Sequence, residues 1–126
     1  MAQPLSDQLP AILVVEDEVL IRMGLVDMIE GAGFKVYEAA HADAAISLME
    51  AHPDIRVLFT DIEMPGSMDG IKLSHYVRHR WPPVKIFVTS GQSWPSSRDL
   101  PSEAVFLSKP CLDRDLQRVY QAAQGA

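Results

Sequence analysis

Short apolar runs alternate along the chain with segments in which apolar residues recur at helical spacing. The first run, residues 11–15, is apolar throughout, which is typical of a strand buried on both faces of a sheet. Further β-rich runs follow at residues 35–39, 56–60, 85–89 and 104–108. Strands that alternate with helices predict an α/β fold, with a parallel sheet and crossover helices.

Helical periodicity predicts helices in most of the segments between these strands. After the first run, apolar residues at i, i+3, i+4, i+7, i+8 and i+11 predict a helix with one buried face. This stripe consists of Ile21, Gly24, Leu25, Met28, Ile29 and Ala32. Two more helices are predicted over residues 43–52 and from residue 71 to a stop at Trp81, and a last one has the stripe Leu112, Leu116, Val119 and Ala123. Met23, Met28 and Met49 occupy helical spacings and are predicted to lie in or near the core.

The connection between the fourth and fifth predicted strands departs from this pattern. It contains Gly91, Pro95 and Pro101 together with several serines. A proline inside a helix lacks the N–H and clashes with the preceding turn, and the residue before a proline avoids helical geometry. At most residues 95–99 can therefore be helical. We expect a short or irregular, mobile connection where a crossover helix would otherwise lie.

Composition and charge narrow the class of protein. The chain has 126 residues, of which 48% are hydrophobic, and we expect a leader over 1–9 and one compact domain over 10–126. Seventeen acidic against eleven basic residues give a formal charge of -6, which disfavours direct binding to nucleic acid. Since no apolar stretch approaches the roughly 20 residues that span a bilayer, membrane insertion is not expected. The single cysteine, Cys111, fits a reducing compartment and a cytoplasmic location.

Polar side chains follow four of the predicted strands. Glu16 and Asp17 end the first, Asp61 ends the third, Thr89 and Ser90 end the fourth and Lys109 follows the fifth. In an open parallel sheet, the carboxyl ends of the strands share one edge, where ligands bind. We therefore expect these side chains to meet in one site.

The chemistry of this group indicates phosphoryl transfer. Glu16, Asp17 and Asp61 would repel one another unless a cation offset their charge, and Mg²⁺ prefers a sparse set of carboxylates. Lys109 supplies a positive charge and Thr89 a hydroxyl donor for phosphoryl oxygens. Carboxylates are known to form acyl-phosphate intermediates, which makes Asp61 the candidate nucleophile.

Four sequence strings resemble those of a known family. ILVVEDE, LFTDIEMPGSMDGI, KIFVTSG and FLSKP occur in this order, each at a predicted strand end, and resemble the receiver domain of bacterial response regulators in two-component signalling. The similarity covers about residues 10–124 and is to stand-alone, chemotaxis-regulator-like receivers. It implies a flavodoxin-like, doubly wound sheet of five parallel strands in the order 2-1-3-4-5. The chain departs from the family in the loop after Asp61, which is one residue longer, and in its degenerate or shortened fourth helix.

The resemblance implies a role for each residue of the site. Asp61 is expected to be the phosphoacceptor, with Thr89 and Lys109 holding phosphoryl oxygens. The expected Mg²⁺ ligands are Asp17 and Asp61 directly, Glu16 largely through metal-bound water, and the backbone carbonyl of Glu63. Phe106 occupies the position of the aromatic switch residue, which changes rotamer when Thr89 moves inward; plain core packing is the other interpretation of this residue. The resemblance also implies a sharp turn at Lys109–Pro110, for which we predict a cis peptide bond.

The implied function is a signalling switch that takes a phosphoryl group from a phosphohistidine and changes its partner-binding surface. It would catalyse its own phosphorylation and dephosphorylation without turning over a separate small molecule. The expected partners are a sensor histidine kinase or histidine phosphotransfer protein and an unknown downstream protein. With no effector after residue 126, output is expected through protein contacts or phosphoryl relay, although the chain could also be a piece of a hybrid kinase. We further expect phosphorylation to order the 91–103 connection through Thr89 and Ser90.

Two alternatives remain at this stage. A degenerate receiver would serve as a constitutive interaction module, which the retained carboxylates, threonine and lysine disfavour. An aspartate-nucleophile phosphatase would need a second acid two residues after the nucleophile, where Glu63 stands, but the chain has no cap domain to enclose a substrate. Mass analysis after incubation with Mg²⁺ and a small phosphodonor separates a working receiver from a degenerate one.

Overall fold

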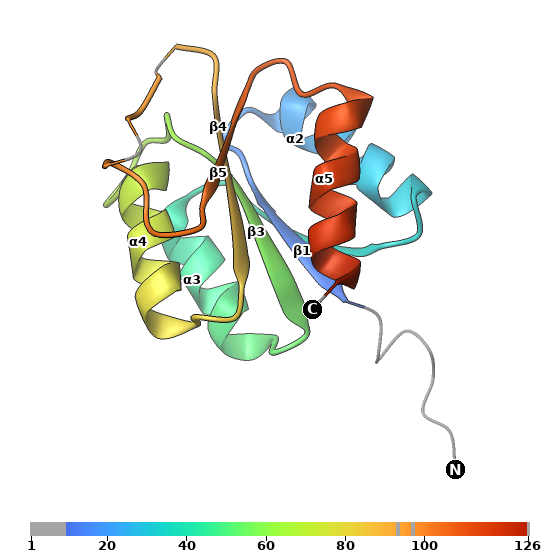
Figure 1. The fold of residues 1–126 in the computed structure, drawn as a ribbon, viewed down its shortest axis with the longest axis horizontal. Helices are drawn as coiled ribbons and strands as arrows, with labels where there is room; N and C mark the ends of the chain where they lie inside the picture. Colours follow the sequence, from blue (N-terminus) through green and yellow to red (C-terminus); the bar gives the residue numbers. More distant parts are fainter. Residues whose placement is uncertain (1–9, 93, 97, 126) are drawn as a thin grey trace.

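The computed structural model describes residues 10–92, 94–96 and 98–125. Within these ranges five parallel strands form one sheet in the order β2-β1-β3-β4-β5 (Figure 1). The strands are β1 (Ala11–Val15), β2 (Lys35–Ala39), β3 (Ile55–Asp61), β4 (Lys85–Ser90) and β5 (Val105–Ser108). This confirms the flavodoxin-like fold and the strand order implied by the resemblance. The strand order reverses between β1 and β3, which is where such sheets bind ligands.

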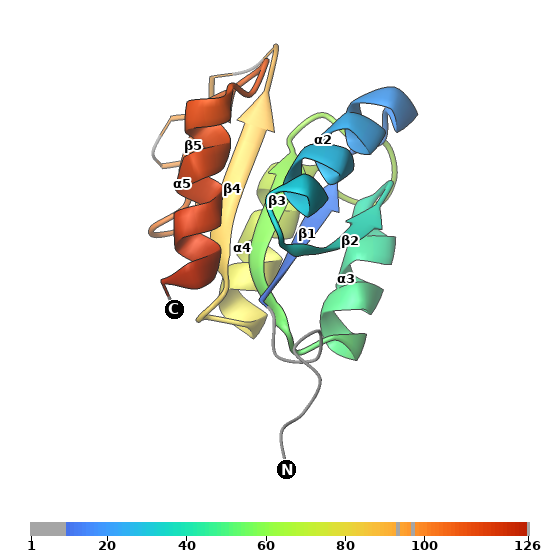
Figure 2. The same ribbon diagram turned by 90° about the vertical axis from the view of Figure 1, so that its right-hand side faces the viewer.

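Helices cover both faces of the sheet. The helices in the described ranges are α2 (Val19–Gly31), α3 (Ala42–Ala51), α4 (Gly70–Arg80) and α5 (Asp113–Gln124). Figures 1 and 2 show α2 and α5 on one face and α3 and α4 on the other. No helix in the described part of the chain is both long and apolar enough to cross a membrane.

Alternate residues of the buried strands supply the two sides of the core. In β1, Leu13 and Val15 pack toward α3 and α4, whereas Ile12 and Val14 pack toward α2 and α5. All residues of β1 are buried, as the uninterrupted apolar run predicted. The central strands are thereby fixed on both faces, and the side chains at their carboxyl ends start from rigid positions.

The predicted buried stripe of α2 is wrong at most of its positions, because Gly24 and Ala32 are exposed as well as Ile21 and Met28. Ile29 is buried, but Ile21 is 38%, Met28 43% and Met23 54% exposed, so neither methionine of this helix is a core residue. The reason is an open hollow of about 410 Å³, which separates this part of α2 from Cys111 and its neighbours after β5. Periodicity correctly predicted the helix but could not show what its apolar face meets.

Two further predictions about apolar residues have opposite outcomes. Met49 lies in the core between α3 and the sheet, as expected. Leu112 does not belong to the buried stripe of the last helix, because it precedes α5 as its N-cap and is 47% exposed. The stripe of α5 itself, Leu116, Val119 and Ala123, is buried.

The connection between β4 and β5 has no helix among its described residues, as the prolines predicted. Side chains of α4 hold it instead. The His75 ring forms a hydrogen bond with the carbonyl oxygen of Asp99 at 2.8 Å, and Nε of Arg78 donates to the carbonyl oxygen of Ser102 at 3.0 Å. In Figure 1 the orange trace of this connection runs beside α4. The predicted mobility stays a prediction.

Gly70 fixes the approach of α4 to the end of β3. A Cβ atom at this position would overlap the carbonyl oxygen of Asp61. The amide of Gly70 also donates to the carbonyl oxygen of Ile62 at 2.9 Å. Glycine is required here because a side chain would push the helix away from the strand end that carries the candidate nucleophile.

Candidate functional site at the carboxyl ends of the strands

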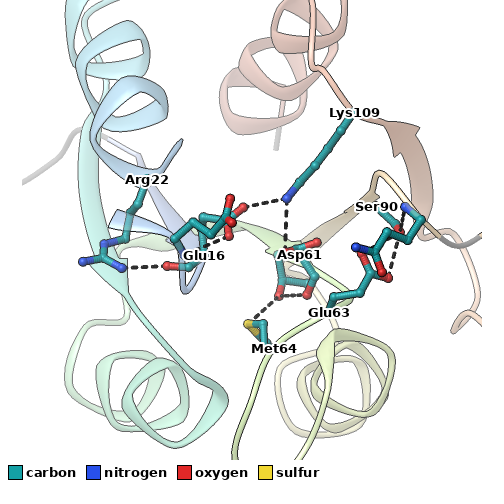
Figure 3. A network of polar contacts seen from close by, with 10 residues as sticks. Glu16, Arg22, Asp61, Glu63, Met64, Ser90 and Lys109 are labelled. Atoms are coloured by element: carbon teal, nitrogen blue, oxygen red, sulfur yellow. Dashed lines mark hydrogen bonds and ion pairs between the residues drawn. The ribbon is translucent and has the colours of Figure 1, made fainter. Parts of the chain in front are cut away.

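The strand-end residues meet on one edge of the sheet, as predicted. Glu16 and Asp17 follow β1, Asp61 ends β3, and Lys109 follows β5. Glu16, Asp17 and Asp61 each offer a carboxylate oxygen within 4.8 Å of the others. Figure 3 shows Lys109 reaching between Glu16 and Asp61. The structure thus brings together the acidic cluster and the lysine that the sequence suggested.

Asp61 is the central residue of this site. It is only 4% exposed, because β3 is the middle strand of the sheet. Its Oδ2 lies 3.2 Å from Nζ of Lys109, whereas its Oδ1 is buried with no hydrogen-bond partner among the described residues. Burial raises the pKa of Asp61 to about 6, Glu16 adds to the rise and Lys109 opposes it. The ionised carboxylate is therefore destabilised and lacks a cationic partner on one side.

Lys109 is held by two carboxylates. Its Nζ lies 2.9 Å from Oε1 of Glu16 and 3.2 Å from Oδ2 of Asp61. Burial works against the charge, but the hydrogen bonds with Glu16 and Asp61 and the attraction of their charges together outweigh it and raise the pKa of Lys109. Its backbone amide donates to the carbonyl oxygen of Ser90 at 3.0 Å, and the Lys109–Pro110 peptide bond is cis, as predicted. The lysine is a fixed positive charge beside Asp61.

Glu16 is oriented by its neighbours in the chain. The residue is 2% exposed, and its Oε2 accepts a hydrogen bond from the amide of Glu18 at 3.1 Å. Arg22 donates to the backbone carbonyl of Glu16 at 2.7 Å, so the start of α2 is tied to the end of β1. The Glu16 side chain is thus kept beside Lys109 and Asp61.

The donor set fits a hard divalent cation. Three carboxylates converge, one buried oxygen of Asp61 lacks a partner, and Lys109 alone does not balance their charge. Such cations bind oxygen ligands, and Mg²⁺ is commonly held by one or two carboxylates. Glu16, Asp17 and Asp61 are the residues that would hold it. The expected contribution of the Glu63 backbone carbonyl stays a prediction.

Thr89 and Phe106 lie where the switch residues were expected. Thr89 is buried at 1% exposure and is the register partner of Asp61 across β3 and β4. It also lines the hollow beside α2 together with Lys109. Phe106 is half-buried in β5, with its ring centroid 5.3 Å from that of Trp94. Their proposed movements stay predictions.

Sequence reasoning missed one pairing at the mouth of the site. Oγ of Ser90 donates to the carboxylate of Glu63, at 2.8 Å from Oε1 and 2.7 Å from Oε2 (Figure 3). The amide of Gln92 in turn donates to Oγ of Ser90 at 3.1 Å. The available signal was positional: Glu63 and Ser90 follow neighbouring strand ends. Glu63, Gln92, Asp61 and Lys109 all line an open hollow of about 480 Å³ that leads to the site.

Comparison with known proteins shows one family. The model of the response regulator receiver domain matches residues 12–121. The chain is similar to the response regulator receiver protein CpdR of Brucella abortus, with 37% identity over 109 residues that cover 83% of this chain and 88% of CpdR. It is 36% identical over 103 residues to the sensor kinase CckA of the same organism, covering 79% of this chain but only 11% of the kinase.

A comparison with a solved structure points to the same family. The crystal structure of the receiver domain from the hybrid histidine kinase CckA superimposes with a TM-score of 0.74 at 31% sequence identity, covering 90% of this chain and 99% of that domain. The chain therefore matches a whole receiver domain in this structure, and a small part of the much longer sensor kinase.

Proposed function

Because the chain belongs to the response regulator receiver domain family, we propose that it is a phosphoacceptor switch in which Asp61 takes a phosphoryl group from a phosphohistidine. The observation that carries this proposal is the state of Asp61. The residue is buried, one carboxylate oxygen is held by Lys109, and the other has no partner among the described residues. The carboxylate is thus open, on the side away from Lys109, to a cation or to a phosphoryl group.

The proposed step is an in-line transfer. An oxygen of Asp61 attacks phosphorus, the O–P bond forms, the N–P bond breaks, and the imidazole nitrogen keeps the electron pair of the broken bond. Since the pKa of Asp61 is about 6, most of the carboxylate is ionised at neutral pH and can act as the nucleophile. Lys109 places its positive charge next to the oxygens on which negative charge accumulates. Thr89 is the proposed hydroxyl donor to a phosphoryl oxygen.

We assign the proposed Mg²⁺ to Glu16, Asp17 and Asp61. When bound, the cation neutralises charge on the phosphoryl oxygens. In its absence, the carboxylates have Lys109 as their close cationic partner within the described cluster. Glu16 keeps Lys109 oriented through its 2.9 Å contact, and this contact positions the lysine even before a phosphoryl group arrives.

The proposed phosphoryl donor is a protein, either a sensor histidine kinase or a histidine phosphotransfer protein. Ile21 lines the open hollow that leads to Asp61, and its neighbours Val19 and Leu20 at the start of α2 are exposed apolar side chains. Leu20 is the extreme case at 82% exposure. Clustered exposed apolar residues are typical of interaction sites. A cytoplasmic location and a separate downstream partner belong to the same proposal.

The test is intact-mass analysis of the purified chain after incubation with Mg²⁺ and a small acyl phosphate. The expected result is one added phosphoryl group that hydroxylamine removes. Asp61→Asn should show no such addition, while the exposed-carboxylate control Asp43→Asn should behave as wild type. An unmodified wild-type chain would favour the degenerate receiver, and sustained turnover of simple phosphoesters would favour the phosphatase.

A further inference from the structure

A second hollow, of about 430 Å³, lies at the edge of the sheet opposite to Asp61. It is bounded by the carboxyl ends of α3 and α4 and the amino ends of β3 and β4, which meet at this edge (Figure 1). Sites that hold small ligands have volumes of about 300–1,000 Å³. The residues that line this hollow do not include the acidic cluster or Lys109. It is therefore separate from the proposed phosphorylation site.

The floor and walls of this hollow are apolar and firmly placed. Met49, Ile55 and Val84 form the floor, and their exposures of 4%, 4% and 7% show that the core holds them. The other apolar lining residues are Trp81, Pro53 and Pro83. The Trp81 side chain is flanked by Arg80, whose Cζ lies 5.2 Å from the ring centroid. A flat apolar group placed here would lose contact with water on several sides, which favours binding.

Arg56 gives the rim of the hollow a positive charge. The register between β1 and β3 shifts at this point, because Ala11 pairs with Ile55 and Ile12 with Val57. Arg56 is the residue passed over, and such irregularities redirect a side chain. Its side chain is exposed and forms no hydrogen bond or ion pair with the described residues.

The negative charges near this rim do not balance Arg56. Glu50, which also lines the hollow, has Oε2 3.3 Å from Nη2 of Arg80. Asp54 has Oδ2 3.1 Å from Nζ of Lys35. The carboxyl end of a helix carries about half a negative charge, and the basic last turn of α4 offsets this charge there. The full charge of Arg56 exceeds what the end of α3 contributes, so the hollow favours an anionic ligand.

We propose that this hollow binds a small aromatic carboxylate, with the ring on the apolar floor beside Trp81 and the carboxylate at Arg56. Aromatic rings that meet in offset or tilted geometry gain more than their buried area provides, which favours an aromatic body next to Trp81. Arginine is the side chain that pairs with a carboxylate through two parallel hydrogen bonds. The proposal does not depend on phosphoryl transfer at Asp61, and it adds small-molecule binding to the proposed function.

The first experiment titrates the full wild-type chain with cinnamate and follows backbone and indole N–H signals by two-dimensional NMR. Signals of residues 50–56 and 81–84 that carry an N–H should shift and saturate, with a Kd below about 1 mM. The indole signal of Trp81 should shift with them. The indole signal of Trp94, which is 80% exposed and does not line the hollow, should not move. Cinnamamide and cinnamylamine keep the ring without the negative charge, and both should bind at least about tenfold more weakly.

The second experiment repeats the titration with variants of Arg56. Arg56→Gln should weaken cinnamate binding about tenfold and leave cinnamamide binding unchanged, because only the carboxylate uses the charge. Arg56→Lys keeps the charge without the paired geometry and should give an intermediate affinity. The matched control is Arg118→Gln, which removes an exposed arginine on α5 and should bind cinnamate as wild type does. The same spectra show whether each variant keeps the fold.

Several outcomes would overturn the proposal. These are the absence of saturable shifts around the hollow, binding of cinnamylamine as tight as that of cinnamate, and unchanged cinnamate affinity in a folded Arg56→Gln variant. Shifts that cluster around Lys109 would place the carboxylate at the other edge of the sheet and would equally refute it. Octanoate binding as tight as that of cinnamate would refute the choice of an aromatic body. If Arg56→Gln does not fold, the ligand series on the wild-type chain decides.

Discussion

Replacing Asp61 with asparagine should stabilise the unphosphorylated protein at neutral pH in the absence of divalent cations. The pKa of the Asp61 carboxyl group is raised from 3.8 to about 6, mainly by burial and further by the Glu16 carboxylate. This rise is already net of the attraction of Lys109, which opposes it. Asparagine has nearly the same shape but no charge. Lys109 keeps its ion pair with Glu16, whose Oε1 lies 2.9 Å from Nζ.

The magnitude follows from the linkage between proton binding and folding. Between pH 4 and pH 6 the folded state binds more protons at Asp61 than the unfolded state, so the free energy of unfolding falls as pH rises through this window. The rise of the Asp61 pKa from 3.8 to about 6 lowers the free energy of unfolding by about 3 kcal/mol. This destabilisation is complete above pH 6 and absent below pH 4. The Asp61→Asn variant has no carboxyl group to ionise, so it is not destabilised in this way.

The assay is urea unfolding of wild type and Asp61→Asn at several pH values with a chelator present. The variant should be more stable by about 2–3 kcal/mol at pH 7.5, and this difference should shrink toward zero near pH 4. Asp27→Asn is the control, because Asp27 is an exposed carboxylate inside α2, and should show a difference near zero throughout. Equal stability of Asp61→Asn and wild type at pH 7.5, or a difference independent of pH, would refute the reasoning.

Asp17→Asn should leave the fold intact but abolish phosphorylation with Mg²⁺, because it removes one of the clustered carboxylates; phosphorylation at the wild-type rate in the mass assay would contradict the metal assignment. Gly70→Ala should cost about 1–3 kcal/mol in chemical unfolding, because its Cβ would overlap the backbone of Asp61. The control Gly24→Ala, where a Cβ meets nothing within 4 Å, should instead stabilise α2 by about 0.5–1 kcal/mol. Cys111 should resist thiol reagents at pH 7.5, since burial raises its pKa to about 11; labelling at the rate of a free cysteine would show that the thiol is more accessible.

The sequence predicted the site well because its residues stand at strand ends. An apolar run such as Ala11–Val15, in a chain where strands alternate with helices, is typical of a strand buried in a parallel sheet. Once it is placed there, Asp17 and Asp61 must meet at the same edge. Side-chain identity and strand order were therefore enough to assemble the acidic cluster with Lys109.

The features that the sequence did not predict depend on which side chains and elements contact each other in space. Met28 has the spacing of a core residue, but the hollow beside α2 leaves it 43% exposed. The pairing of Glu63 with Ser90 depends on the orientation of one flexible side chain, which spacing along the chain does not specify. The proline-containing connection was correctly predicted to lack a full helix, but its attachment to His75 and Arg78 required the positions of two elements in space.

Gly70 packs so closely against the backbone of Asp61 that there is no room for even a Cβ atom between α4 and the end of β3. A shift of the strand end by a fraction of an ångström therefore displaces the first turn of α4 instead of being absorbed by a side chain. The same helix carries His75 and Arg78 about one and a half and two turns later. Because α4 is a single helix, it links the backbone at Asp61 to the far end of the connection, which His75 and Arg78 hold.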